Sequence, residues 1–250
     1  MVRTATPEPA PQWTAWIDGS SGAPEEKLAL EEALLQRVAA GRLGAVARVW
    51  LNGPSLVLGR FEARRLQRRG GLPADFQGAP VLVRASGGSA VPHGPDELNV
   101  TLCYPVPHVP AAPEPGYRLL LKGLQQALRR AYGVEAGEGA VPGSFCDGRF
   151  NLVVEGRKLA GTAQAQRRGA VLVHATLMVS GRGVDRLRQV AAFYEAAGDP
   201  GSWNPESVAS VSEVLGRAVT PQDLMVPVLD ALIGGETGVA AGAARLGGEL

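Results

Sequence analysis

The 250-residue chain contains only two cysteines and three histidines. The cysteines do not form a Cys-x-x-Cys pair and the histidines do not form a His-x-x-x-His pair. The sequence therefore has neither a disulfide framework nor the ligand spacing of a metal site. We expect no metal site and a reducing compartment.

Long apolar runs and an excess of charge are also missing. No apolar run reaches the about 18 residues that a membrane span needs, and the N-terminus lacks the charged-then-apolar pattern of a secretory signal. The formal net charge of +1 argues against nucleic acid as a partner, because a polyanion usually needs a clear basic excess. These absences predict a cytoplasmic protein that binds neither a membrane nor nucleic acid.

The composition is that of one folded domain with loose ends. A hydrophobic content of 45% at this length is enough for a substantial core. Residues 1–12 are rich in proline and almost devoid of apolar side chains, so we expect a disordered tail there. The glycine- and alanine-rich residues 233–250 are expected to fray, which leaves residues 13–232 as the folded domain.

Apolar patterning places strands before and between helices. The turn residues Asn52-Gly53-Pro54 predict a hairpin of strands 45–51 and 55–58, and strand 98–104 is expected to pair with strand 80–84. Because strands and helices do not alternate regularly, the pattern predicts an α+β fold. The other expected elements are strands at 13–17, 152–154, 159–164 and 170–179, and helices from Pro24 to just before Gly41, at 117–132, 184–197 and 210–215, and from Thr220 onward.

One lysine stands out in the strand-rich stretch 149–179. Lys158 follows the turn Glu155-Gly156-Arg157 and opens a strand whose next residues suit an interior. We expect its ammonium at the lip of a sheet, where it could meet an anion. On residue type alone, a solvated lysine is the alternative.

A glycine loop at 86–89 (Ser-Gly-Gly-Ser) joins two of the expected strands. Without Cβ atoms in the way, its backbone amides can approach a carboxylate or a phosphate. Arg84 precedes the loop and could pair bidentately with the same anion. Taken alone, the loop is equally compatible with an ordinary hairpin connection.

Several segments together resemble one known family. Residues 156–164 (GRKLAGTAQ) and 167–177 (RRGAVLVHATL) resemble the G-x-K-[IV]-[SAG]-G-[ST]-A-Q and R-x-G-x-x-x-H-G-[ST]-L segments of the lipoate-protein ligase and octanoyltransferase family, relatives of biotin protein ligase. Residues 84–93 (RASGGSAVPH) resemble its glycine loop, 28–35 (LALEEALL) its first helix, and 56–60 (LVLGR) a short strand. The matching order and spacing extend the resemblance over roughly residues 13–232.

The resemblance implies a fold, partners and site residues. The fold would be a mixed, largely antiparallel sheet flanked by helices, here without the C-terminal accessory domain that ligases often carry. The protein partner would be a lipoyl domain of 2-oxoacid dehydrogenase complexes or the glycine cleavage H protein. Lys158 would be catalytic. The residues expected to bind the acyl or adenylate group are Arg84, Ser86, Gly87, Gly88, Ser89, His93, Gly161, Thr162 and His174.

Two departures from the family pattern bear on the reaction. Where ligases continue the loop as His-Asp-x-Gly-Asn, this chain has residues 93–97 (HGPDE), which look more like an octanoyltransferase. One transferase branch has its nucleophilic cysteine where this chain has Ala170, so that mechanism is excluded. A second branch has its cysteine in the loop before the central strand, where this chain has Cys146, although the spacing to the strand is about three residues shorter here.

Three hypotheses follow. The first, and the favoured one, is a ligase that activates a free acid with ATP and Mg²⁺ and attaches a lipoyl or octanoyl group to a lysine of a lipoyl domain. The second is a transferase that needs no cofactor and moves octanoate from acyl carrier protein through a Cys146 thioester. The third is a non-catalytic protein that binds an acyl chain or a partner.

Three smaller predictions concern other side chains. Val57, Leu58 and Val91 are expected either to wall an apolar slot for the acyl tail or simply to belong to the core. Cys103 is most simply a small core residue. The one basic cluster is either a solvated face or a docking patch for an acidic protein, and it consists of Arg60, Arg64, Arg65, Arg68 and Arg69.

Overall fold

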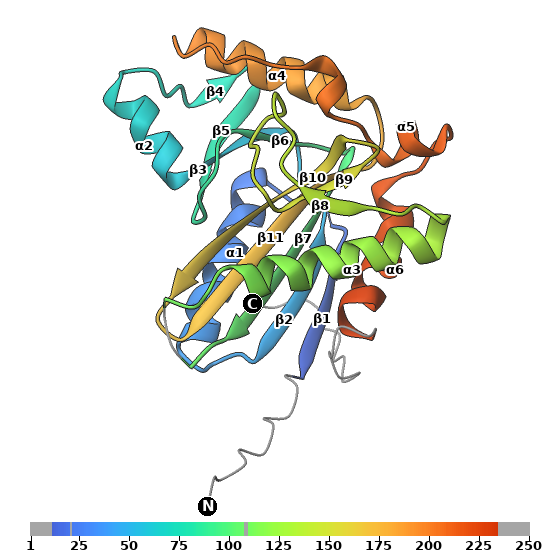
Figure 1. The fold of residues 1–250 in the computed structure, drawn as a ribbon. Helices are drawn as coiled ribbons and strands as arrows, with labels where there is room; N and C mark the ends of the chain where they lie inside the picture. Colours follow the sequence, from blue (N-terminus) through green and yellow to red (C-terminus); the bar gives the residue numbers. More distant parts are fainter. Residues whose placement is uncertain (1–11, 21, 108–109, 235–250) are drawn as a thin grey trace, which may run out of the picture.

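The computed structural model of the protein describes residues 12–20, 22–107 and 110–234, and it contains a large and a small β-sheet (Figure 1). The tails expected at 1–12 and 233–250 lie almost entirely outside the described residues. In the large sheet only β1 and β2 run parallel, and every other neighbouring pair is antiparallel. Its order is β1 (Trp13–Asp18), β2 (Ala45–Trp50), β7 (Glu97–Pro105), β11 (Ala170–Met178), β10 (Arg157–Arg167), β9 (Asn151–Val154) and β8 (Gly137–Gly139).

The small sheet holds the strands that carry the glycine loop. β3 lies at its centre, parallel to β5 and antiparallel to β6, and the glycine loop joins β5 to β6. The order is β4 (Asp75–Phe76), β5 (Ala79–Arg84), β3 (Ser55–Gly59) and β6 (Val91–His93). The prediction of a mixed, largely antiparallel α+β fold is confirmed.

The predicted strand pairings around the two sheets are wrong. β2 and β3 do not form a hairpin, because β2 already has β1 on one side and β7 on the other. All six residues of β2 are buried, so this strand belongs in a sheet interior with both edges paired. For the same reason β7 lies between β2 and β11 in the large sheet and does not pair with β5.

Helices cover both faces of the large sheet and one side of the small one (Figure 1). Alternation along β2 shows the two faces: Ala47 and Val49 pack with α3 and α6, whereas Val46 points to the core beneath α1. The small sheet packs against α2 and α4. The helices are α1 (Pro24–Ala39), α2 (Arg60–Arg68), α3 (Glu114–Tyr132), α4 (Gly183–Ala196), α5 (Val211–Leu215) and α6 (Pro221–Ile233).

A buried charge cluster ties β1, α1 and β2 together near the cleft. The carboxylate of Asp18 pairs with both Lys27 and Arg48, and all three side chains are almost fully buried. The guanidinium of Arg48 also stacks on the ring of Trp50, 4.4 Å from its centroid. These contacts fix the orientation of Trp50, which forms one wall of the cleft described below.

Cys103 is fully buried in the core under α1, as predicted. None of the helices that the structure describes combines the length and the apolar character that a membrane span would need.

Candidate active site

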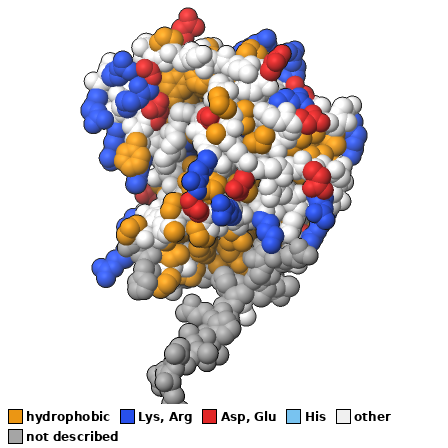
Figure 2. All heavy atoms as spheres, in the orientation of Figure 1, with side chains coloured by type: hydrophobic (Ala, Val, Ile, Leu, Met, Phe, Trp, Pro, Cys, Tyr) orange, Lys and Arg blue, Asp and Glu red, His pale blue; other side chains and the backbone are white. Residues whose placement is uncertain are grey.

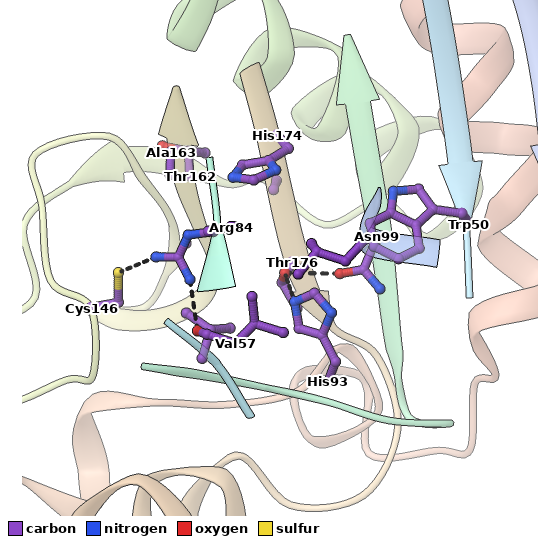
Figure 3. A pocket seen from close by; sticks show the side chains of 14 residues that line it. Trp50, Val57, Arg84, His93, Asn99, Cys146, Thr162, Ala163, His174 and Thr176 are labelled. Atoms are coloured by element: carbon purple, nitrogen blue, oxygen red, sulfur yellow. Dashed lines mark hydrogen bonds between the residues drawn. The ribbon is translucent and has the colours of Figure 1, made fainter. Parts of the chain in front are cut away.

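A cleft opens where the large and small sheets face each other beside α1 (Figure 3). It has about 370 Å³ of empty volume, a figure that includes space open to solvent. Val57 and Val91 line it and are also part of the core, whereas Leu58 points away into the core with α2. The lining residues are Leu28, Trp50, Val57, Arg84, Val91, His93, Asn99, Cys146, Gly161, Thr162, Ala163, His174, Ala175 and Thr176.

Arg84, the last residue of β5, holds the glycine loop in shape. Its Nη2 donates to the carbonyl oxygens of Gly87 at 2.8 Å and Ser89 at 3.0 Å, and its Nη1 donates to the carbonyl of Val57 at 2.8 Å. The loop therefore takes up most of the donors that were expected to form a bidentate pair with a substrate anion. Arg84 still lines the cleft, and its positive charge acts on the groups there.

The two glycines of the loop are not equivalent. Gly88 has a left-handed φ of 96°, and a Cβ there would lie 2.6 Å from Nη2 of Arg84 and 2.7 Å from Sγ of Cys146. A Cβ at Gly87 would meet open space. Only Gly88 is required to be glycine, because the guanidinium and the thiol occupy the volume of a side chain.

Cys146 lies in the loop between β8 and β9, and its backbone is unusual. Its φ of 47° is one of three positive values among the non-glycine residues that the structure describes, and such strain is common at functional sites. Nη2 of Arg84 points at Sγ from 3.7 Å, and Ser89 also donates to the sulfur. Burial alone raises the pKa of the thiol, but the charges of Arg84 and Lys158 outweigh it, so the pKa lies below its ordinary value.

The prediction that Lys158 lies at the lip of a sheet is wrong. Its side chain is fully buried, and its ammonium donates to the carbonyl oxygens of Phe145 at 2.6 Å and Cys146 at 2.8 Å. The cysteine loop folds over the start of β10 and covers the lysine, which no local pattern could show. Burial lowers the pKa of Lys158 to about 8.

Gly161 connects this buried lysine to the cleft. It lines the cleft, and a Cβ there would lie 3.0 Å from Nζ of Lys158. An ammonium has three N–H donors, and two of those of Lys158 reach loop carbonyls, while Nζ also lies 5.1 Å from the centroid of the Phe145 ring. The neighbouring Thr162 donates from Oγ1 to the carbonyl of Phe150 at 2.7 Å, so it anchors the cysteine loop from the other side.

His93 forms a chain of neutral hydrogen bonds at the end of the cleft. Nδ2 of Asn52 donates to its Nδ1 at 3.1 Å, so its Nε2 carries the proton and donates to Oγ1 of Thr176 at 3.1 Å. Thr176 in turn donates to Oδ1 of Asn99 at 2.9 Å (Figure 3). Burial, reinforced by the charge of Arg84, lowers the pKa of His93 to about 3 and keeps the ring neutral.

His174 on β11 joins the glycine loop to α1. Its Nε2 lies 2.8 Å from Oγ of Ser86, and its Nδ1 lies 2.8 Å from Oε2 of Glu31. Burial alone would raise the pKa of Glu31, but the charge and hydrogen bond of His174, together with the Thr101 hydroxyl, lower it to about 2. Sequence reasoning missed Glu31. Its signal was a carboxylate on the apolar stripe of α1, three residues after Leu28 and three before Leu34.

The residues after His93 do not suit a divalent cation. Glu97 is buried and accepts from Nε of Arg186 at 2.6 Å, while Asp96 pairs with Arg186 and accepts from Ser180. Both carboxylates already pair with the guanidinium of Arg186, Glu97 in the interior and Asp96 at the surface. Within the described residues, no group of three His, Cys, Asp or Glu side chains is placed to hold a metal ion.

One known family matches most of the chain. Residues 23–233 match the family described as the lipoyl protein ligase A/B catalytic domain. The chain belongs to this family. Membership in the lipoyl protein ligase A/B family confirms both the resemblance and the prediction of an enzyme that acylates proteins.

Several curated relatives carry the name octanoyl-[GcvH]:protein N-octanoyltransferase. The one from Kyrpidia tusciae is 41% identical over 181 residues, which cover 68% of this chain and 62% of the relative, less than two thirds of its length. The one from Geobacillus kaustophilus is 32% identical over 240 residues, which cover 90% of this chain and 84% of the relative.

Solved structures of the family share the fold. Protein Ta0514 from T. acidophilum, with bound lipoic acid, superposes with a TM-score of 0.69 at 19% identity, covering 94% of this chain and 90% of that one. A lipoate-protein ligase A bound with ATP gives a TM-score of 0.64 at 18% identity, with the same coverage of 94% and 90%. At such identities the similarity establishes the fold.

Proposed function

We propose that this protein is an acyltransferase that moves an octanoyl group to a lysine of a lipoyl-carrying protein through a thioester on Cys146. The observation that carries the proposal is the placement of the Cys146 thiol in the cleft, beside Arg84 and over the buried ammonium of Lys158. Both positive charges lower the thiol pKa, and a thiolate is the nucleophilic form of cysteine. The names of the relatives favour the same reaction over the ATP-dependent ligase.

In the first half-reaction the thiolate attacks the carbonyl carbon of an octanoyl-lysine amide on the donor. A carbon–sulfur bond forms and the carbon–nitrogen bond breaks. The departing amine takes up a proton that Lys158 supplies. The third N–H of Lys158 first stabilises the oxyanion that develops on the carbonyl oxygen, and its proton passes to the amine as the tetrahedral intermediate collapses.

In the second half-reaction the amine of an acceptor lysine attacks the thioester. A carbon–nitrogen bond forms, the carbon–sulfur bond breaks and the thiolate is restored. The attacking nitrogen gives its proton to the now neutral Lys158, so the cycle closes without a net loss of protons. A pKa of about 8 suits a group that must both give and take a proton near neutral pH.

The donor and acceptor in this proposal are lipoyl-carrying proteins. The names of the relatives specify octanoyl-GcvH as donor, so we favour that carrier over acyl carrier protein. Transfer from an amide through a thioester needs neither ATP nor Mg²⁺, and Asp96 and Glu97, the carboxylates of the loop after His93, are paired with Arg186.

An intact-mass experiment tests the proposal. Incubation with octanoylated GcvH without ATP should add one octanoyl group that hydroxylamine removes, and the adduct should be absent in Cys146→Ala and present in Cys103→Ala. A parallel sample with free octanoate, ATP and an unmodified lipoyl domain tests the ligase hypothesis. Acylation in that sample alone, unaffected by Cys146→Ala, would contradict the transferase mechanism.

A further inference from the structure

Four arginines lie on the helix α2 and a fifth, Arg69, directly follows it, and the structure separates the five into two groups. Arg65 and Arg69 turn toward one acidic residue, Asp199: Arg65 pairs with it, and Nη1 of Arg69 lies 2.7 Å from its Oδ1. The other three have no acidic partner among the residues that the structure describes. They recur at every fourth position, which places them on one face of a helix, and they are Arg60, Arg64 and Arg68.

This face also exposes a large aromatic side chain. Phe61 is 60% exposed, and the guanidinium of Arg60 stacks on its ring at 4.8 Å from the centroid. The opposite face, with Ala63 and Leu66, is buried against the small sheet. Figure 2 shows Lys and Arg side chains gathered over α2 at the upper left of the molecule. We call Arg60, Phe61, Arg64 and Arg68 the arginine face.

The arginine face is joined directly to the glycine loop. The backbone N–H of Arg60 donates to the carbonyl of Ser86 at 3.0 Å. At Gly59 the two backbones are in close contact, since a Cβ there would lie 2.2 Å from the carbonyl oxygen of Gly88. The face therefore begins at the rim of the site, in direct backbone contact with the glycine loop.

A second connection runs through a buried tyrosine. The hydroxyl of Tyr194 donates to Glu62 on α2 at 2.8 Å and accepts from the backbone N–H of Ala90 at 3.0 Å. Glu62 is held in turn by Arg65 at 2.8 Å. The inward side of α2 therefore contacts the end of the glycine loop through Tyr194. The arginine face points outward and is available to an external partner.

We infer that the arginine face docks an acidic surface of the acyl-bearing protein domain, beside the lysine that carries or receives the acyl group. The inference rests on the proposed acyl transfer and adds where the partner binds. Three like charges within about 12 Å on one helix attract a partner of opposite charge and raise its encounter rate. Arginine and an exposed aromatic ring are also the residues most enriched at protein interfaces. A net charge of +1 and so short a basic stripe make nucleic acid the weaker alternative.

The double variant Arg64→Glu/Arg68→Glu tests the inference. With octanoylated GcvH as donor, we expect its KM to rise by at least about tenfold, kcat to stay within about twofold, and the salt dependence of kcat/KM to weaken. The matched control is Arg167→Glu/Arg168→Glu, which makes the same change in charge at the exposed β10–β11 turn, away from α2 (Figure 1). The control should keep the wild-type KM.

A small acyl donor separates this inference from the proposed function. Loading of Cys146 by octanoyl-CoA does not need a docked protein, so it should proceed at the wild-type rate in the Arg64/Arg68 variant. If wild-type protein does not load from either donor, the proposed function fails. If the wild-type protein loads, two results would contradict the docking role of the arginine face. Either the Arg64/Arg68 variant and the Arg167/Arg168 control raise KM equally, or neither of them raises it. Binding to a duplex DNA oligonucleotide should also be measured. If the wild type binds and only the Arg64/Arg68 variant loses that binding, the arginine face is a nucleic-acid site and the inference is wrong.

Discussion

The ammonium of Lys158 donates a hydrogen bond of 2.8 Å to the backbone carbonyl of Cys146. The residue proposed to shuttle protons therefore also holds the loop that carries the nucleophile. A second bond, to the carbonyl of Phe145, fixes the preceding residue in the same way. This arrangement keeps Cys146 in its left-handed conformation, with Sγ directed at Arg84.

Replacing Lys158 with Met should reduce acyl transfer by at least about 10²-fold, because both the proton shuttle and an oxyanion donor are lost.

The Lys158→Met change should also alter how the stability of the protein depends on pH. The pKa of Lys158 is about 8 when folded, below the 10.5 of the free side chain, so the unfolded state binds more protons between these values. The lysine therefore makes wild-type stability rise from pH 8 to 10.5, and Lys158→Met should flatten that rise. Urea unfolding at pH 7, 8.5 and 10 measures the difference, and identical slopes would argue against a buried, pKa-shifted lysine.

Cys146 should react with iodoacetamide as a thiolate at lower pH than an ordinary cysteine. Arg84 and Lys158 both favour the charged form, so either Arg84→Gln or Lys158→Met should move the midpoint of the rate–pH profile upward. Cys103 is the internal control, because burial raises its pKa to about 12 and shields it. Folded Cys146→Ala should show no fast labelling. Unchanged midpoints in both variants would remove the electrostatic explanation.

Gly88→Ala should abolish transfer while Gly87→Ala should leave it nearly intact. The new methyl at position 88 would overlap the guanidinium of Arg84 and the thiol of Cys146, in a backbone conformation that already disfavours a side chain. At position 87 the methyl meets open space. Thermal unfolding and transfer assays on the pair measure the contrast. Equal activity in the two variants would mean that the contact of Gly88 with the thiol has no catalytic consequence.

Glu31→Gln should lower the free energy of unfolding at pH 7 by about 1.5–3 kcal/mol, the range for hydrogen bonds to charged groups. The pKa of Glu31 is about 2 when folded against 4.5 for the free side chain, so its contribution is present above about pH 4.5 and is lost as the pH falls toward 2. The variant should lack that acid-sensitive component. Glu32→Gln, at the exposed neighbouring position, is the control and should behave like the wild type. Matching acid profiles in all three proteins would contradict the role of the Glu31–His174 pair.

Much of the site could be located from the sequence because it lies in short contiguous motifs. Three motifs each occupy a contiguous segment of about ten residues, whose residue types and spacing resemble those of the family. They are the glycine loop, the segment around Lys158 and the strand with His174. Cys146 was proposed from the resemblance to one transferase branch, with a different spacing to the strand, and the structure places it in the lining of the cleft. Local patterns also set most helices and strands, since the periodicity of apolar residues reports which face of an element is buried.

The partners of these residues were decided only by the tertiary structure. Strand pairing between β2 and β7, or β3 and β5, depends on long-range competition for sheet edges, which the turn at Asn52-Gly53-Pro54 does not reveal. The same holds for the burial of Lys158, which requires a loop from another part of the chain to cover it.

The electrostatics of the site follow the same division. The sequence by itself determined which ionisable side chains the motifs supply, among them Arg84, Cys146, Lys158 and His174. Only the fold decided that Glu31 meets His174 and that two positive charges converge on one thiol, because charge interactions depend on distance and burial in space. The shifted pKa values of Cys146 and Lys158, on which the proposed reaction depends, are therefore properties of the tertiary structure.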